Sequence, residues 1–184
     1  MRKIFFFFFL FLCSAANAAH PIFGDYQNSF RAEGFRTTDF WSDGAGHLML
    51  TYSQPSTWWR LEGRRNVHIM RFVGRTRGAH PMYLREQLGV STGNSIAQWA
   101  IGYSHDIIFW QPRNFFFGAG IGGFVKEQKN DFGGSRWMWG ERIFIGYRAG
   151  RMHFEFALTH YSNGRMHKFN HGVNSFGFGI GWAF

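Results

Sequence analysis

Large apolar residues recur at every second position along most of this chain, which is the period of a β-strand rather than of a helix. The last ten residues show the pattern most clearly. Phe176, Phe178, Ile180, Trp182 and Phe184 alternate there with glycine or alanine. The pattern predicts a C-terminal strand over 175–184, with one large apolar face and one face of small residues.

The same alternation predicts seven further strands. They cover residues 47–54, 66–74, 82–91, 98–109, 115–125, 137–147 and 152–162. Residues 27–36 fit two interpretations, either another strand or a lead-in to the first one. Eight antiparallel strands are enough to close a small barrel. Because small and charged residues occupy the inward positions, we expect a narrow barrel filled by side chains rather than an open pore.

The composition indicates that this barrel crosses a membrane. The chain has 184 residues, of which 21% are aromatic, and a mean hydropathy of −0.24. That value is too low for a bundle of membrane helices, and no segment after the N-terminus resembles a spanning helix. A closed barrel satisfies every backbone edge within the hydrocarbon. The predicted fold is therefore all-β, an eight-stranded antiparallel transmembrane β-barrel.

Residues 1–18 have the layout of a secretory signal peptide, with a basic start, an apolar run at 4–12 and small residues up to Ala18. The apolar run is too short for a membrane anchor. A leucine precedes Cys13, where a lipoprotein signal has a small residue. We expect cleavage after Ala18, which removes the only cysteine and leaves 19–184 as an outer-membrane β-barrel.

The chain is basic, with 20 Lys and Arg against 11 Asp and Glu. Arginines gather at 60–65 and 71–77, a pattern that indicates contact with phosphate groups. Because the chain is exported, we expect no nucleic acid partner, and lipopolysaccharide is the better candidate. Some of these arginines are equally expected to solvate turns or to fill the barrel.

An even number of strands predicts that both termini lie in the periplasm. The last strand then descends from the outer side, so 163–173 becomes an outer loop and Ala149-Gly150 a tight periplasmic turn. This orientation places His160 and Ser162 near the outer rim. Both continue the lipid-facing row of Leu158.

Histidine and serine at positions i and i+2 of a strand share one face, as a nucleophile and its general base require. A purely structural interpretation is also open. If the strand has left the hydrocarbon by His160, polar residues cost little there. Such pairs are common, so the spacing of His160 and Ser162 is not specific by itself.

The surrounding residues make the pattern specific. His160-x-Ser162-Asn163 is followed by a polar loop, then by Asn170-x-Gly172, and then by a terminal strand that ends in phenylalanine. Over about the last 30 residues the chain resembles the lipid A 3-O-deacylase (PagL) family. These enzymes are eight-stranded barrels in the outer membrane of Gram-negative bacteria, and they hydrolyse the ester of the 3-hydroxyacyl chain at position 3 of lipid A.

The resemblance implies a role for each matching residue. Ser162 would be the nucleophile and His160 the general base of a serine esterase, while Asn163 and Asn170 would belong to the oxyanion site. The substrate would be lipid A in the outer leaflet, which the active site would face. No metal or other cofactor is implied. The resemblance allows a homodimer, although no segment of the sequence marks an interface.

The sequence departs from the family at the third member of the triad. Asn174 stands where the best-known members have a glutamate, and no acidic residue follows Glu155. An asparagine can orient an imidazole through its side-chain oxygen. It supplies no charge to stabilise the imidazolium.

Glu141 is an alternative acid. With 149–150 as a two-residue turn, 139 pairs with 160, but a shift of two residues puts Glu141 opposite His160, within contact distance. Glu141 is instead expected to pair with Arg142 or with a loop arginine under a simpler interpretation. Glu155 has interior parity, and we expect it to pair with Arg142 or Arg148.

His167 and His171, with His160, are a candidate metal site, but the i, i+4 spacing of His167 and His171 suits a helix and this segment is predicted as a loop, so we expect a surface histidine pair and no metal site. Two alternative functions remain open. The missing glutamate favours an alternative function, a non-catalytic lipopolysaccharide-binding or structural barrel. A third hypothesis is a small adhesin-like barrel in which the motif is a coincidence.

Overall fold

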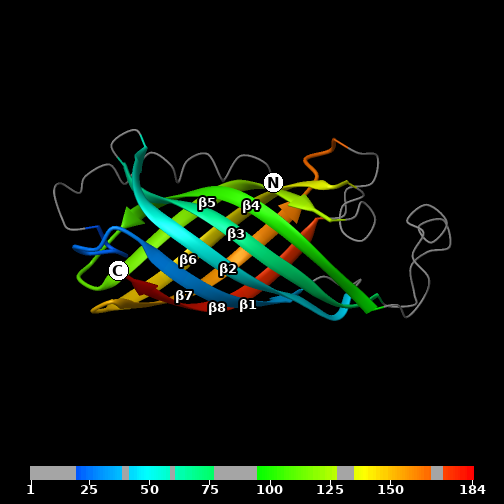
Figure 1. Ribbon diagram of the computed structural model, residues 1–184, viewed down its shortest axis with the longest axis horizontal. Helices are drawn as coiled ribbons and strands as arrows, with labels where there is room; N and C mark the ends of the chain where they lie inside the picture. Colours follow the sequence, from blue (N-terminus) through cyan, green and yellow to red (C-terminus); the bar gives the residue numbers. More distant parts are fainter. Residues whose placement is uncertain (1–19, 39–41, 59–60, 77–94, 128–134, 167–171) are drawn as a thin grey trace, which may run out of the picture.

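The computed structural model describes residues 20–38, 42–58, 61–76, 95–127, 135–166 and 172–184. They form one closed antiparallel barrel in which each strand pairs with its neighbours along the chain and the last strand pairs with the first (Figure 1). The strands are β1 (Ser29–Thr37), β2 (Ser42–Trp58), β3 (Leu61–Thr76), β4 (Ser95–Trp110), β5 (Phe115–Lys126), β6 (Trp137–Ala149), β7 (Met152–Ser162) and β8 (Val173–Ala183).

The predicted fold class and the number of strands are confirmed, with one change in the list of strands. Residues 27–36 belong to a strand, β1, rather than to a lead-in. The predicted strand at 82–91 lies outside the described residues, and β3 pairs directly with β4. Within the described residues, no helix is long and apolar enough to cross a membrane.

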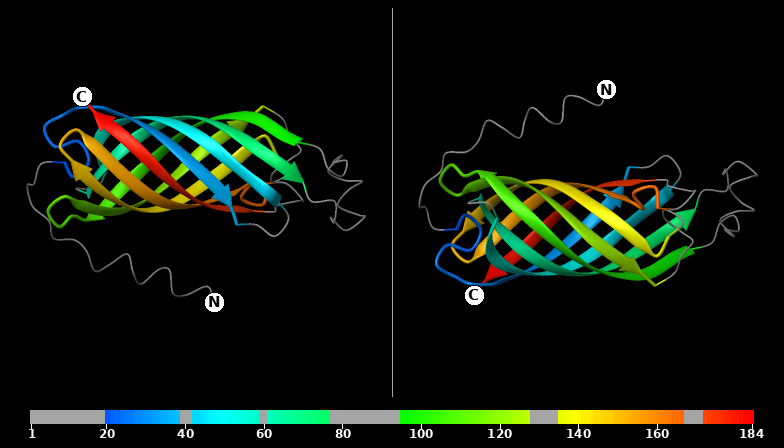
Figure 2. Two further views of the ribbon diagram at one scale, coloured as in Figure 1. Left: turned by 90° about the horizontal axis from the view of Figure 1, so that it is seen from below. Right: turned by 90° about the horizontal axis from the view of Figure 1, so that it is seen from above.

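The barrel closes where β1 meets β8. Their pairing runs from Ser29 opposite Ala183 to Thr37 opposite Ser175. One residue further, the amide of Phe184 donates to the carbonyl of Asn28 at 2.8 Å, so the pairing extends to the last residue. We call this end, which carries the C-terminus and the start of the described chain, the terminal end, and the opposite one the loop end (Figure 2).

The outer face of the barrel is apolar. Alternate residues of β8 from Phe176 to Trp182 are exposed, as the alternation predicts for a lipid-facing surface. Exposed aromatic residues gather toward both ends of the strands: Trp58, Trp110, Phe115, Tyr147 and Trp182 at the terminal end, and Trp99, Trp137 and Trp139 toward the loop end. Two aromatic girdles around an apolar band are typical of an outer-membrane barrel.

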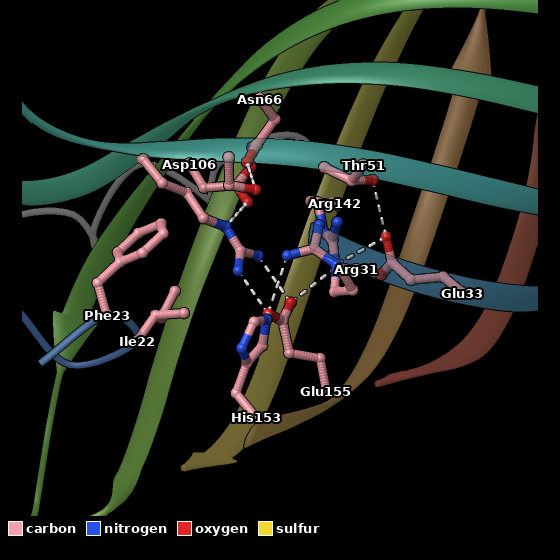
Figure 3. A network of polar contacts seen from close by, with 12 residues as sticks. Ile22, Phe23, Arg31, Glu33, Thr51, Asn66, Asp106, Arg142, His153 and Glu155 are labelled. Carbon is pink, nitrogen blue, oxygen red and sulfur yellow. Dashed lines mark hydrogen bonds and ion pairs between the residues drawn. The ribbon is translucent and has the colours of Figure 1, made fainter. Parts of the chain in front are cut away.

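The interior is filled by side chains, with a charged network at its centre (Figure 3). Three buried arginines face three buried carboxylates there: Arg31, Arg64, Arg142, Glu33, Asp106 and Glu155. Glu155 accepts from Arg142 at 3.1 Å, which confirms the predicted pair. It also accepts from Arg31 at 2.9 Å and contacts Arg64, so the carboxylate has three cationic partners.

The segment before β1 packs inside the terminal end of the barrel. Ile22 and Phe23 are fully buried there, next to the charged network (Figure 3). The imidazole Nε2 of His20 lies 2.6 Å from the carbonyl oxygen of Gly63 on β3. These contacts attach the segment to the barrel.

The turn between β6 and β7 lies one residue later than predicted. Ala149 pairs with Met152, so Gly150 and Arg151 form the turn. Gly150 has φ +62°, which glycine adopts without strain at the first central position of a two-residue hairpin turn. The position of this glycine therefore sets the register of the two strands that carry the candidate site.

Candidate active site

The register places His160 between two polar residues of the neighbouring strands. Glu141 on β6 is its direct partner on one side, and Asn174 on β8 is its partner on the other. The shifted register that brings Glu141 opposite His160 is thus confirmed. The unshifted one is wrong, because Trp139 pairs with Ser162.

All three side chains of this row, those of Glu141, His160 and Asn174, point away from the barrel interior. Glu141 and Asn174 are exposed and His160 is half-buried, and the residue on either side of each along its strand is buried. They therefore continue the outer face that the apolar residues of the same strands cover.

The imidazole of His160 is hydrogen-bonded to Asn174. Its Nδ1 lies 2.7 Å from the side-chain oxygen Oδ1 of Asn174. Because a carbonyl oxygen only accepts, Nδ1 must carry the proton, and Nε2 of the neutral ring is left with a free lone pair. This tautomer is the one in which Nε2 acts as a base.

Ser162 lies two residues from His160 on the same face of β7 and is half-buried. Positions i and i+2 of a strand are about 7 Å apart between Cα atoms. Within the described part of the chain, the Ser162 hydroxyl makes no hydrogen bond to His160. Contacts between a nucleophile and its base often tighten only when substrate is bound.

Gly172, which begins the approach to β8, lies against the imidazole. A Cβ atom added to Gly172 would overlap the ring carbon Cε1 of His160 and lie 2.9 Å from Nε2. Only a residue without a side chain leaves room for the ring in this position. The backbone at Gly172 therefore packs against the imidazole of His160 and limits the positions of the ring.

Asn163 directly follows the nucleophile candidate and is fully buried. Its Oδ1 accepts a hydrogen bond from the amide of Arg165 at 2.9 Å, and its carbonyl accepts one from the amide of Met166 at 3.0 Å. Gly164 and Arg165 both have positive φ, of 60° and 66°. Asn163 thus holds a tight turn at the end of β7, and Asn170 lies outside the described residues.

Glu141 makes no hydrogen bond or ion pair with any described residue. The expected pairing with Arg142 is wrong, because Arg142 points into the barrel, where its Nη2 lies 2.9 Å from Glu33. Alternation along β6 separates the two neighbours, since consecutive residues of a strand face opposite sides. Glu141 is therefore an exposed carboxylate on the outer face beside His160.

A surface hollow of about 580 Å³ opens beside the Asn174 side of this row. It runs over β1 between the neighbouring strands. Its lining includes Gly34, Arg36, Leu48, Phe156, Phe176 and Phe178. Gly34 has Leu48 on one side and Phe178 on the other, so the missing side chain of Gly34 leaves a depression between two apolar walls.

No group of three His, Cys, Asp or Glu side chains converges as a metal site within the described ranges. His167 and His171 lie outside those ranges.

The sequence profile of the family described as "Lipid A 3-O-deacylase (PagL)" matches residues 26–183, nearly the whole barrel. The chain belongs to this family. Members are lipid A deacylases, and the family together with the barrel fold makes this chain a protein of the outer membrane with lipid A as its substrate. The resemblance seen in the C-terminal motif is thereby confirmed.

A solved structure agrees on the fold. The "Crystal structure of the outer membrane enzyme PagL" matches 85% of this chain and 99% of its own, with 18% identity and a TM-score of 0.53. The outer membrane protein Ail of Yersinia pestis in a phospholipid bilayer nanodisc matches 87% of this chain and 100% of its own, with 8% identity and a TM-score of 0.48. No curated protein sequence matches the chain.

Two features of this region were not found from the sequence. The hollow over Gly34 and the packing of Gly172 on His160 depend on pairs of residues from different strands, which only the register brings together. A glycine at an outward position of a strand can indicate a depression in the outer face. Gly34, between the outward residues Ala32 and Arg36, is such a signal.

Proposed function

We propose that this protein hydrolyses the 3-O-linked 3-hydroxyacyl ester of lipid A as a serine esterase, with Ser162 as nucleophile and His160 as general base. The hydrogen bond from His160 to Asn174 carries this proposal, because it fixes the tautomer that a base requires. The loop end would face outward, so that the site meets lipid A in the outer leaflet. The mechanism needs no metal or cofactor.

In the proposed reaction, Ser162 Oγ attacks the ester carbonyl and its proton passes to His160 Nε2. The tetrahedral intermediate then expels the oxygen at position 3 of the sugar, and this oxygen receives the proton from His160. Water, with its proton drawn to His160, hydrolyses the acyl-serine and releases a 3-hydroxy fatty acid. The hollow beside Asn174 has the apolar walls that an acyl chain needs.

The oxyanion would be held near the turn after Ser162. We propose that Asn163 acts there by ordering the turn, which keeps backbone amides next to the nucleophile. Asn170 remains the candidate for a side-chain donor. Asn174 is the proposed third member of the triad, with Glu141 as the alternative acid.

The test is mass spectrometry of lipid A from cells that express the wild-type chain, Ser162→Ala, Asn174→Ala or Glu141→Ala. We expect the wild type to remove one 3-hydroxyacyl group from position 3 and Ser162→Ala to remove none. The two remaining variants identify the residue on which His160 depends. Unchanged lipid A from cells with correctly folded wild-type barrel would contradict the proposal.

The neutral Asn174 favours one second candidate, a barrel of the same scaffold that binds lipopolysaccharide without cleaving it. In that case the wild type and Ser162→Ala would leave lipid A intact to the same extent. Both would still bind lipid A in vesicles.

A further inference from the structure

An exposed arginine lies on the outer face near the candidate site. Arg36, the penultimate residue of β1 at the loop end, is exposed and makes no hydrogen bond or ion pair with any described residue. Its neighbours on both sides of the sheet are Phe176 and Gly46, neither of which offers a counter-charge. A charge on the lipid-facing side is tolerated close to the membrane interface, where the cost is small.

Arg36 is close to the reacting groups. Thr38, two residues further along the same face of β1, donates its amide to the carbonyl of Asn174 at 2.8 Å. Across β8, Arg36 is level with Leu158 of β7, about 10 Å away, and Ser162 lies four residues further along β7. A long arginine side chain on β1 therefore reaches the headgroup of a molecule whose ester lies at Ser162.

Arg36 also belongs to the rim of the apolar hollow. An acyl chain that lies in the hollow would thus have the cation Arg36 beside the end that is nearest the candidate site. A second arginine follows on the other side of Gly46: Arg71 on β3 pairs with Leu48 and lies over the ring of Trp99 at 4.7 Å. The guanidinium of Arg71 thus lies toward β4, away from Arg36, and a Cβ atom on Gly46 would overlap the carbonyl oxygen of Phe35.

We propose that Arg36 binds a phosphate group of the lipid A headgroup and so positions the position-3 ester at Ser162. This inference rests on the proposed function, and it names the phosphate as the part of the substrate that sets where the ester lies relative to Ser162. A guanidinium binds phosphate through two parallel hydrogen bonds, which fix orientation as well as position. Apolar contacts in the hollow would not by themselves stop the acyl chain from sliding along the hollow.

The test compares the wild type, Arg36→Gln and Arg36→Lys on lipid A with both phosphates and on lipid A from which the 1-phosphate, the 4′-phosphate or both have been removed. We expect Arg36→Gln to lower kcat/KM on the bisphosphorylated substrate about tenfold, mainly through KM, and Arg36→Lys to lower it less. Removal of the bound phosphate should lower the wild-type value similarly. Arg36→Gln should then cause no further loss.

Arg65→Gln is the matched control. Arg65 is an exposed arginine on the outer face of β3, near the terminal end and far from the site, so its loss should not change kcat/KM. The proposal is overturned if Arg36→Gln lowers activity equally on phosphorylated and fully dephosphorylated lipid A. It is also overturned if Arg36→Gln behaves like Arg65→Gln.

Binding separates this proposal from the proposed reaction. Ser162→Ala and the double variant Ser162→Ala/Arg36→Gln are measured for binding to phosphatidylcholine vesicles that contain lipid A with or without its phosphates. Weaker binding of the double variant to phosphorylated lipid A alone supports the subsite even if the wild type cleaves nothing. Equal binding of both variants overturns the subsite even if the wild type is an active deacylase.

Discussion

Glu141 and His160 are direct cross-strand partners in the β6–β7 pair, yet the hydrogen bond of the imidazole runs to the other side, to Asn174 on β8. Directly opposed side chains have Cβ atoms about 5 Å apart, so Glu141 is near the ring without touching it. In the proposed triad, the two tasks of the acid would thus be divided. Asn174 orients the ring, and Glu141 is the nearest described source of negative charge on the same face.

Replacement of Asn174 by glutamate should raise kcat, because a carboxylate orients the imidazole and also stabilises the imidazolium formed during attack. Asn174→Ala should lower kcat about 100-fold, through loss of the favoured tautomer. Release of 3-hydroxy fatty acid by purified protein measures both effects. Full activity of Asn174→Ala together with an inactive Glu141→Gln would instead assign the orienting role to Glu141.

Gly172→Ala should displace the His160 ring, since the new methyl group would occupy the space of Cε1. We expect kcat to fall at least about tenfold, because a small misplacement of a catalytic base is costly. Gly123→Ala on β5 is the control, as nothing lies within 4 Å of a Cβ added there. An equal loss in both variants, or unchanged kcat in Gly172→Ala, would contradict the packing argument.

Glu155→Gln should destabilise the barrel by about 3 kcal/mol, because removal of one member of a buried charged network leaves the other charges uncompensated. Arg31 and Arg64 lose their shared anion in this variant. Urea unfolding in detergent micelles measures the free energy. Glu141→Gln, the same substitution at an exposed site, should change it by less than about 0.5 kcal/mol.

Docking of the segment before β1 should weaken in acid. Burial lowers the pKa of His20 from 6.5 to about 4, the hydrogen bond to the Gly63 carbonyl opposes this shift, and the positive charges of Arg64 and Arg148 add to it. A base with a lowered pKa is docked in its neutral form. The docking energy is therefore complete above pH 6.5 and is lost as the pH falls toward 4.

Hydrogen exchange at the amides of Gly24 and Tyr26, which are hydrogen-bonded within the segment, tests this dependence. After correction for intrinsic rates, protection should fall about 30-fold between pH 7.5 and pH 5. His20→Gln keeps a donor toward Gly63 but does not titrate, so its protection should not change over this range. A wild type with constant protection would exclude His20 as the cause.

The leader should be removed after Ala18, so that the protein isolated from membranes begins at Ala19 and lacks Cys13. Intact mass spectrometry of the purified barrel measures this. Ala16→Arg, which puts a large charged residue into the cleavage site, should leave the precursor uncut. A membrane form of the wild type that still reacts with a maleimide would show that Cys13 is retained.

The fold and most of the site were predictable because a strand has a strict period of two. Alternation alone assigns His160, Ser162 and Asn174 to the same outward row as Phe176 and separates them from the inward Glu155. The turn after β6 was harder to predict. Moving the two-residue turn by one position, from 149–150 to 150–151, changes which residue of β6 opposes His160. The sequence alone is compatible with either position of the turn.

The sequence by itself determined the barrel, seven of its eight described strands, the face on which each residue lies and the motif at the end of β7, because these depend on local periodicity and spacing. Only the tertiary structure decided which strand positions meet. Glu141 opposite His160, Arg36 beside Phe176, and Glu155 among three arginines all depend on register and on closure of the barrel. Those contacts join distant segments, and their energy is shared by the whole sheet rather than by any one stretch of sequence.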